Sequence, residues 1–368
     1  MRPLLAAAIA VLVVPTALAG AGAAYTDSVC RAGGVSWTSD RCAGRQWGLT
    51  AINAPQAWRK TRGARVTVAV VDTGADLRHP DLRRRLLRAP GSNLLKNTAS
   101  RCPWQPRTAG ARRSRALAQD DNGHGTHVAG TIAAATGNVI GVAGVAPRAR
   151  VLPVKVLDRK GAGSERDVAR GICFAVRHGA SVINMSLGND PVSSVFIRGG
   201  KEGEDVNRAV AYAYARGVSV LIAAGNETFP ACDFPASHTK ALCVGAADRH
   251  DLKATYSNFG VSIGVVAPGG AGGGLGCDSD DDVWSTILPR HRAGECGGRA
   301  GYEPLAGTSM ATPHVSGVAA LVIARFGKRR ASPGFVYDRL KSTADDLGLP
   351  GADLVYGYGR INALRAVS

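Results

Sequence analysis

The chain has 368 residues, 45% of them hydrophobic, and 45 Lys and Arg against 28 Asp and Glu give it a net charge of +17. This is enough for one large domain or two small ones with a sizeable core. The basic residues are dispersed, without aromatic interleaving or a known nucleic-acid-binding motif, so the charge indicates an arginine-rich solvated surface and no dedicated nucleic-acid partner.

Residues 1–24 have the organisation of a secretory signal peptide. Arg2 supplies the positive end, Leu4–Val14 the apolar core, and small residues up to Ala24 a cleavage site. No later apolar run is long enough to span a membrane, so no transmembrane anchor is predicted. We therefore expect a secreted, extracellular protein.

The eight cysteines, an even count, agree with export through an oxidising compartment. They predict disulfides and not metal ligands, because no C-x-x-C pair occurs. Cys30 and Cys42 lie in the short polar stretch 25–45, interpreted as an N-terminal extension, where pairing by proximity is a guess. Cys277 and Cys296 lie in the glycine-rich insertion 269–301 with its acidic run at 278–282. This insertion is interpreted as a disulfide-tied surface loop, with a cation or substrate-steering site as the alternative.

From residue 46 to 368 the pattern predicts a single domain in which strands and helices alternate. A surface segment with a short helix is expected in 51–58, and 89–119 is expected to be a loop insertion. Strands are predicted at 66–71, 150–156, 181–187, 218–224, 241–246 and 263–267. Helices are predicted to begin near His124 and at 164–178 with Ser164 as cap, 206–216, 315–326 and 335–342. This alternation predicts an α/β fold with a parallel, doubly wound central sheet and helices on both faces.

Several of these strands end at residues that could form a site. Asp72 follows the first strand, Ser186, Leu187 and Gly188 the third, and Asn226 the fourth. In open parallel sheets ligands bind beyond the carboxyl ends of the strands, so these residues are predicted to share one edge. A buried aspartate at such a position needs a partner, although a turn aspartate is the plain alternative.

The stretch Gly307–His314 places Ser309 at the start of a helix. The first turn of a helix leaves backbone N–H donors without partners, and a serine there has an exposed hydroxyl. Such a serine suits a nucleophile if a base lies within hydrogen-bond reach and a third group orients that base. His124, at the mouth of another helix, is the candidate base; with His127 it also forms an i, i+3 pair, but the H-E-x-x-H zinc pattern is absent.

The order Asp72, His124, Ser309 on a parallel α/β sheet matches one known order of serine triads. The blocks around these residues, Val71–Gly74, His124–Gly130 and Gly307–His314, resemble the three signature blocks of the subtilase serine peptidases, and Ala223–Asn226 resembles their oxyanion segment. The likeness covers about residue 46 to the C-terminus. The Asn226–Cys243 loop and Ser257–Gly260 are similar to secreted, disulfide-containing members such as the proteinase K group.

The resemblance implies a secreted serine endopeptidase acting on polypeptides through an acyl-enzyme. Ser309 would be the nucleophile, His124 the general base and Asp72 the group that orients it. The backbone N–H of Ser309 and the side-chain amide of Asn226 would form the oxyanion hole. His127 and His314 match positions that are not catalytic in the family and are interpreted as structural.

The resemblance also implies where a substrate lies. An extended peptide would pair beside Ser186, Leu187 and Gly188, and the first specificity pocket would be walled by these residues and by Ala223, Ala224 and Gly225. No acidic residue nearby in sequence is expected to be directed at this pocket. Broad cleavage with an apolar preference is therefore the expectation.

Calcium is the one cofactor implied, in a structural role, and no organic cofactor is expected. Asp81 and Asn138 match a family calcium loop, completed by backbone carbonyls of Thr136, Ile140 and Val142, with Asp40 as a further candidate ligand. Residues 25–45 are too few for the folding pro-domain that many subtilases carry. We hypothesise that the enzyme folds without one, and a need for added pro-domain would contradict this.

Two alternatives remain open at this stage. One is a processing peptidase of narrow specificity for a single exported protein, and the other is a catalytically silent secreted binding protein. A monomer is expected, with a possible loose association of the basic surface with an anionic cell surface.

Overall fold

A computed structural model of the chain describes residues 30, 35–188, 196–198, 203–238, 240–272, 279–289 and 301–368. The predicted signal peptide, Cys277 and Cys296 lie outside these residues. No helix in the described ranges combines the length and the apolar character needed to cross a membrane.

The centre of the fold is a six-stranded, all-parallel sheet with strand order β2-β1-β4-β6-β7-β8. Its strands are β1 (Thr67–Asp72), β2 (Arg150–Lys155), β4 (Val182–Met185), β6 (Ser219–Ala223), β7 (Leu242–Ala247) and β8 (Ile263–Pro268). The order runs outward in both directions from β1, which is the mark of a doubly wound sheet. The predicted fold class is confirmed.

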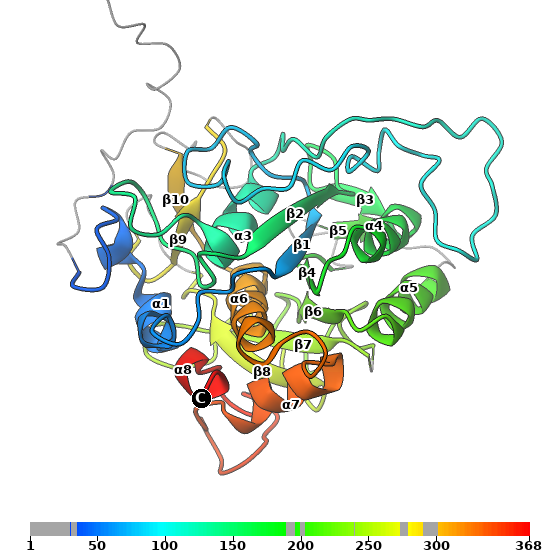
Figure 1. Ribbon diagram of the computed structural model, residues 1–368. Coiled ribbons are helices and arrows are strands. Elements are labelled where there is room, and N and C mark those ends of the chain that lie inside the picture. Colours follow the sequence, from blue (N-terminus) through cyan, green and yellow to red (C-terminus); the bar gives the residue numbers. More distant parts are fainter. Residues whose placement is uncertain are drawn as a thin grey trace, which may run out of the picture.

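The two faces of the sheet carry separate hydrophobic cores, because successive residues of a strand point to opposite sides. In β1, Val68 and Val70 belong to one core while Ala69 and Val71 belong to the other. Figure 1 shows α3 and α6 on one side of the sheet and α4 and α5 on the other. The helices are α1 (Trp47–Ala51), α2 (Ala54–Ala57), α3 (His124–Ala133), α4 (Glu165–Arg177), α5 (Gly203–Ala215), α6 (Thr308–Phe326), α7 (Pro333–Ser342) and α8 (Ala363–Ala366), with a 3₁₀ turn at Ala43–Arg45.

Most predicted elements are found within a few residues of their expected bounds, and Ser164 caps α4 by accepting from the Asp167 N–H at 3.1 Å. Two expectations were wrong. The segment 51–58 is not on the surface, because Ile52 and Ala57 are fully buried in the core. The chain between 269 and 305 is not only loop, since it contains β9 (Val283–Thr286), which pairs antiparallel with β10 (Tyr302–Leu305).

A second short pair was also missed. The three-residue strands β3 (Ala162–Ser164) and β5 (Phe196–Arg198) pair in parallel. Strands this short give no periodic signal in the sequence, and their partners decide whether they form.

Three disulfides are present in the described residues: Cys30–Cys42, Cys102–Cys173 and Cys232–Cys243. The first agrees with the proximity guess. The second joins the irregular insertion 89–119 to α4. The third joins the segment after Asn226 to β7, so it anchors the loop that follows the predicted oxyanion residue.

Candidate active site

Asp72 is the last residue of β1 and is completely buried. Its Oδ1 accepts a hydrogen bond from the Thr73 backbone N–H at 2.7 Å. The His124 Nδ1 lies 2.9 Å from Oδ1 and 3.0 Å from Oδ2 of Asp72. Because both neighbours of this ring nitrogen are acceptors, Nδ1 carries the proton and Nε2 is left as the basic nitrogen.

His124 opens helix α3, where backbone geometry fixes its ring against Asp72. Gly123 precedes it with φ 116°, and the His124 N–H is held by the Asn122 Oδ1 at 3.0 Å. Gly125 allows the helix to approach the end of β1, since a Cβ at Gly125 would stand 2.2 Å from the Gly74 carbonyl oxygen. The glycines of this block therefore let strand and helix meet closely enough for the carboxylate–imidazole contact.

A second buried carboxylate, Asp120, holds the same turn. Its Oδ1 accepts from the backbone N–H groups of Asn122 (2.9 Å) and Gly123 (3.1 Å), and its Oδ2 accepts from Thr126 N (3.0 Å) and Thr126 Oγ1 (2.6 Å). Burial would raise the pKa of Asp120, but these hydrogen bonds, with the charge of Lys155, lower it below its usual value. Asp120 is therefore an anion at the mouth of α3.

The two carboxylates act on His124 in the same direction. Burial by itself opposes the imidazolium, but the charge of Asp72, its hydrogen bond and the charge of Asp120 outweigh it and raise the pKa of His124 above its ordinary value of 6.5. The site therefore stabilises the protonated form that a general base becomes when it takes a proton.

Ser309 is the second residue of α6, after Gly307 with φ 149°. Pro313 within this helix has no N–H to give to the Ser309 carbonyl four residues earlier. The Ser186 hydroxyl donates to that carbonyl instead, at 2.8 Å, and the Ser309 hydroxyl donates to the Ser186 carbonyl at 3.4 Å. The two serines are thus tied together, which fixes the end of β4 against the start of α6.

Within the described residues, no hydrogen bond joins the Ser309 hydroxyl to His124. Helices α3 and α6 pack directly on each other, and each residue lies in the first turn of its helix. Hydrogen bonds between nucleophile and base are often loose when no substrate is bound. The structure thus joins Asp72 to His124 by direct contact and brings Ser309 to the same edge of the sheet.

Asn226 follows β6 and is oriented by Thr308. Its Oδ1 accepts from Thr308 N at 2.9 Å and from Thr308 Oγ1 at 3.0 Å. Because the oxygen is used in this way, the amide N–H groups of Asn226 are its remaining donors, next to the start of α6. The buried Asn258 supports this segment, accepting from Glu227 N at 3.0 Å and donating to the Ala224 carbonyl at 3.1 Å.

The predicted substrate walls lie where β4 and β6 end, and Ser186 of the first wall is hydrogen-bonded to Ser309. The expectation that no acidic group faces them was wrong. A Cβ on Gly225 would stand 2.6 Å from the Glu227 Oε2, which accepts from Asn258 Nδ2 at 2.7 Å, and 2.7 Å from the Asp233 Oδ2. A Cβ on Gly188 would stand 3.8 Å from the same oxygen of Asp233. Asp233 is brought here by its backbone, which donates to the Ala224 carbonyl at 2.9 Å. Sequence spacing hid this contact because the loop 226–233 folds back onto its own strand.

The predicted calcium loop is assembled in one place. Asp40 Oδ1 accepts from Asn138 N at 2.9 Å and its Oδ2 from Gly137 N at 2.8 Å, so Asp40 joins the loop. The Asp81 carboxylate accepts from Asn138 Nδ2 (2.6 Å), Tyr302 OH (2.9 Å) and Val142 N (3.1 Å). Burial, with a smaller contribution from Asp40, raises the pKa of Asp81 to about 7.

The donor set of this loop suits a hard cation. Among the described residues, the carbonyls of Thr136, Ile140 and Val142 accept no backbone hydrogen bond. No group of three or more His, Cys, Asp or Glu side chains in the described ranges forms a metal cluster, so any ion here depends on carbonyl and amide oxygens in addition to carboxylates. Two neighbouring carboxylates with free carbonyl oxygens fit calcium.

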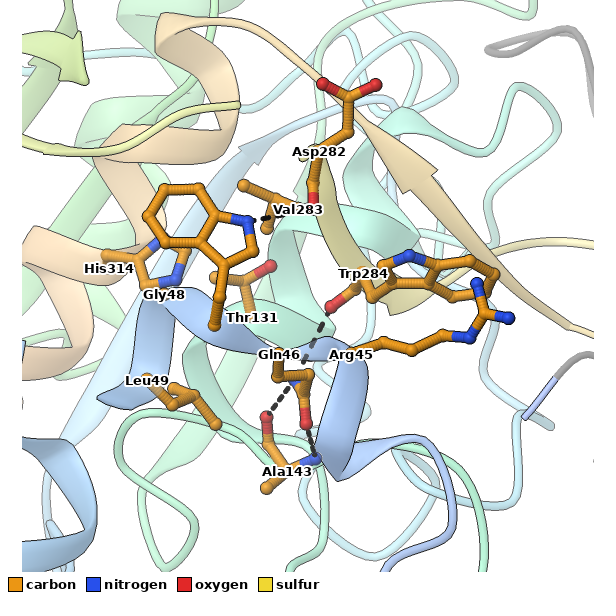
Figure 2. A pocket seen from close by; sticks show the side chains of 11 residues that line it. Arg45, Gln46, Gly48, Leu49, Thr131, Ala143, Asp282, Val283, Trp284 and His314 are labelled. Atoms are coloured by element: carbon orange, nitrogen blue, oxygen red, sulfur yellow. Dashed lines mark hydrogen bonds between the residues drawn. The ribbon is translucent and has the colours of Figure 1, made fainter. Parts of the chain in front are cut away.

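The other two histidines of the motifs are buried, and their rings contact backbone carbonyls. His127 Nε2 lies 3.0 Å from the Val283 carbonyl and 3.1 Å from that of Glu303, so it ties α3 to the β9–β10 pair. His314 Nδ1 donates to the Met310 carbonyl at 2.8 Å, and burial lowers its pKa to about 4. Figure 2 shows the His314 ring beside Gly48, where the N-terminal segment packs on the body.

In the same contact, Gln46 joins the N-terminal segment to the rest of the domain through hydrogen bonds. Its side chain donates to the Ala143 carbonyl at 2.9 Å and accepts from the Ala143 N–H at 2.7 Å (Figure 2). Arg45 lies over the Trp284 ring at 4.6 Å from its centroid. The cavity between these residues holds only about 10 Å³, too little for a substrate group.

Sequence reasoning missed three residues that hold the site: Asp120, Asn258 and Lys155. Lys155 is buried at the end of β2, and its ammonium donates to the carbonyls of Thr73 (2.8 Å) and Leu157 (2.7 Å). Asp120 gave no capping signal, because the N-cap of α3 is Gly123 and Asp120 reaches the helix only through the turn that precedes it. Asn258 and Lys155 act through contacts that no local spacing reveals.

Comparison with known proteins gives the same answer as the geometry. The model of the Subtilase family matches residues 63–359. Thermitase from Thermoactinomyces vulgaris is 35% identical over 323 residues, covering 88% of this chain and 96% of thermitase. Subtilisin Savinase from Lederbergia lenta is 37% identical over 322 residues, covering 86% and 96% respectively. A solved protease structure from Pseudoalteromonas arctica matches with a TM-score of 0.72 and 33% identity, covering 90% of this chain and 99% of that one.

With this fold, these comparisons show that the protein is a serine-type endopeptidase, a hydrolase of peptide bonds. The chain belongs to the subtilase family.

Proposed function

We propose that Asp72, His124 and Ser309 are the catalytic triad of a broad, secreted endopeptidase. Ser309 Oγ attacks the peptide carbonyl while His124 Nε2 takes its proton. His124 then gives that proton to the leaving amine, and water hydrolyses the acyl-enzyme. The observation that carries the proposal is the contact of His124 Nδ1 with both oxygens of Asp72, at 2.9 and 3.0 Å, which fixes the tautomer that a base requires.

The oxyanion formed in the attack is assigned to the Ser309 backbone N–H and the Asn226 amide. Thr308 supports this role because it occupies the Asn226 oxygen and leaves the N–H groups as donors. Such donors act mainly on the transition state, so Asn226→Ala is expected to lower kcat by about 10²–10³ with little change in KM. Asn226→Asp, which keeps the oxygen but loses the donors, should show a comparable loss.

Labelling with a serine-directed fluorophosphonate tests the whole proposal. The wild-type protein should be labelled and should hydrolyse casein, while Ser309→Ala should be unlabelled and lose about 10⁶-fold in kcat. Absence of both labelling and hydrolysis in the folded wild-type protein would instead support a silent binding protein.

We assign the substrate a place along Ser186, Leu187 and Gly188 and against Ala223, Ala224 and Gly225. An apolar preference for the residue before the cleaved bond was expected from the sequence. The position of Asp233 Oδ2 between Gly188 and Gly225 favours a second candidate, a preference for Lys or Arg at that residue.

Paired peptides that differ only in Phe or Lys before the cleaved bond separate the two preferences. If Asp233 selects the cation, Asp233→Asn lowers kcat/KM for the Lys peptide about tenfold or more and leaves the Phe peptide nearly unchanged. An equal effect on both peptides contradicts that selection. Profiling on a peptide library also separates a broad enzyme from a narrow processing peptidase, which would prefer one sequence sharply.

We further propose that the loop at Asp81 holds a structural calcium. Asp40, Asp81, Asn138 and the carbonyls of Thr136, Ile140 and Val142 would be its ligands. The ion would offset the charge of two neighbouring carboxylates and join the N-terminal segment to the body. Secretion through the signal 1–24, a monomeric state and loose attachment of the basic surface to anionic cell surfaces complete the proposal.

A further inference from the structure

A cavity of about 300 Å³ lies on the side of α4 that faces the insertion 89–119 (the cyan loops beside α4 in Figure 1). Five arginines are among the residues that line it: Arg101, Arg107, Arg113, Arg166 and Arg170. The remaining lining residues include the hydroxyls of Thr98, Ser100 and Thr108, and none is acidic. We call this site the arginine cavity. It lies outside the catalytic residues assigned above.

The positive charge of the arginine cavity is largely unbalanced. In the described ranges, Arg170 alone of the five arginines forms an ion pair, with Asp167 at 2.7 Å. Arg101 donates to the Gln105 carbonyl and Arg166 to the Thr108 hydroxyl, both at 2.7 Å, and these neutral acceptors leave the charges in place. Arginine cannot relieve this repulsion by losing its proton, so the charges persist at any physiological pH.

Arg170 is the most informative of the five residues. It is only 6% exposed; its terminal nitrogens donate to the Leu94 and Asn97 carbonyls and pair with Asp167, while among the described residues its Nε has no hydrogen-bond partner. A buried donor of a charged group without an acceptor is costly, so an acceptor that reaches this nitrogen would be stabilised. Arg166 lies one helical turn earlier, where a like charge destabilises the helix. Burial and the neighbouring charge of Arg166 both lower the pKa of Arg170, against the effect of Asp167.

The cavity is held in a fixed shape. The Cys102–Cys173 disulfide ties the insertion to α4, and Arg177 of α4 donates to the Arg101 carbonyl at 2.9 Å and to the Ser100 hydroxyl at 3.0 Å. On the far side, Trp104 Nε1 and Gln105 Nε2 donate to Asp205 of α5 at 2.9 and 2.8 Å. Like charges held together by such a frame are preorganised for a ligand that neutralises them.

We propose that the arginine cavity binds a compact polyvalent phosphate, either free or as the phosphate groups of an anionic polymer. Guanidinium groups match phosphate oxygens bidentately, and the hydroxyls supply further donors. The volume is at the lower end for small-molecule sites, which suits an ion of pyrophosphate size and not a folded segment of another protein. The bound phosphate would stabilise the fold by joining the insertion to α4.

Calorimetry with pyrophosphate tests the proposal in the Ser309→Ala protein, where self-digestion is blocked. One pyrophosphate should bind per chain, and the melting temperature should rise above that in sodium chloride of equal ionic strength. The variant Arg107→Gln/Arg113→Gln/Arg166→Gln should bind about tenfold more weakly or worse. The matched control Arg83→Gln/Arg84→Gln/Arg329→Gln, three exposed arginines away from the cavity, should bind within about twofold of the parent.

Long-chain polyphosphate as a second ligand separates the two sources. Pyrophosphate binding that depends on the cavity arginines shows a site for a free ion, and polymer binding with the same dependence shows that the site also takes the phosphates of a chain. Two results overturn the proposal. One is no binding of either ligand to the folded protein, and the other is an equal loss of binding in the cavity variant and the control, which would indicate general attraction to the +17 surface.

Discussion

Two pairs of buried carboxylates in this enzyme, Asp72 with Asp120 and Asp81 with Asp40, have different surroundings. At the catalytic edge, Asp72 and Asp120 are surrounded by N–H and hydroxyl donors, and the pKa of Asp120 is lowered by them despite complete burial. At the loop 136–142, Asp81 lies near Asp40 and its pKa is raised to about 7, chiefly by burial. Asp120 is stabilised as an anion by the fold itself, whereas Asp81 lacks a compensating positive charge within the described residues.

The difference comes from what each carboxylate faces. Asp120 has Lys155 nearby and accepts four hydrogen bonds, two of them from the N–H groups of Asn122 and Gly123. Asp81 accepts three, yet its neighbour is a second anion. The donors around Asp120 hold its charge without a bound ion. For Asp81 and Asp40 we propose that a calcium ion supplies the positive charge.

Within this comparison, the largest effect is expected at Asp72. Asp72→Asn keeps the shape of the side chain but offers an N–H to His124 Nδ1, so the imidazole adopts the wrong tautomer and Nε2 is no longer a base. We expect kcat to fall by about 10⁴ with an unchanged circular dichroism spectrum. A loss below about tenfold would mean that Asp72 does not orient His124.

The loop should respond to calcium where the catalytic edge does not. In Ser309→Ala protein, calcium at about 100 times its Kd should stabilise the fold by about 2.7 kcal/mol over the chelated state, measured by denaturant unfolding. Asp81→Asn should remove most of this difference, and the exposed Asp338→Asn should keep it. Equal stability of the parent with calcium and with chelator would contradict a calcium site at this loop.

The smallest effect concerns the pH profile. Activity requires neutral His124, whose pKa is raised by Asp72 and Asp120 against burial, so kcat/KM should fall as the pH drops through a value above 6.5. Asp120→Asn removes one of the two negative charges and should move this acid limb to lower pH. Asp121→Asn changes an aspartate that is 54% exposed and pairs with Lys155, and it should leave the limb in place. A limb that does not move in Asp120→Asn would show that Asp120 only holds the turn.

Much of the site was predictable because its motifs are local. The blocks around Asp72, His124 and Ser309 each combine a strand end or helix start with glycines that allow close approach, and these features depend only on neighbouring residues. The parallel sheet followed from the same logic, since alternating apolar runs and amphipathic segments admit few other arrangements.

The sequence by itself therefore predicted the fold class, which the structure confirms, together with the three proposed catalytic positions and the residues of the proposed calcium loop. The tertiary structure decided which groups surround them: Asp120 and Lys155 around the histidine turn, Asp233 against the substrate walls, Asp40 beside Asp81, and five arginines in one cavity. These contacts join residues far apart in the chain or loops that fold back, and their energies depend on burial and on neighbouring charges. Neither quantity exists until the chain has folded, so no pattern along the sequence encodes them directly.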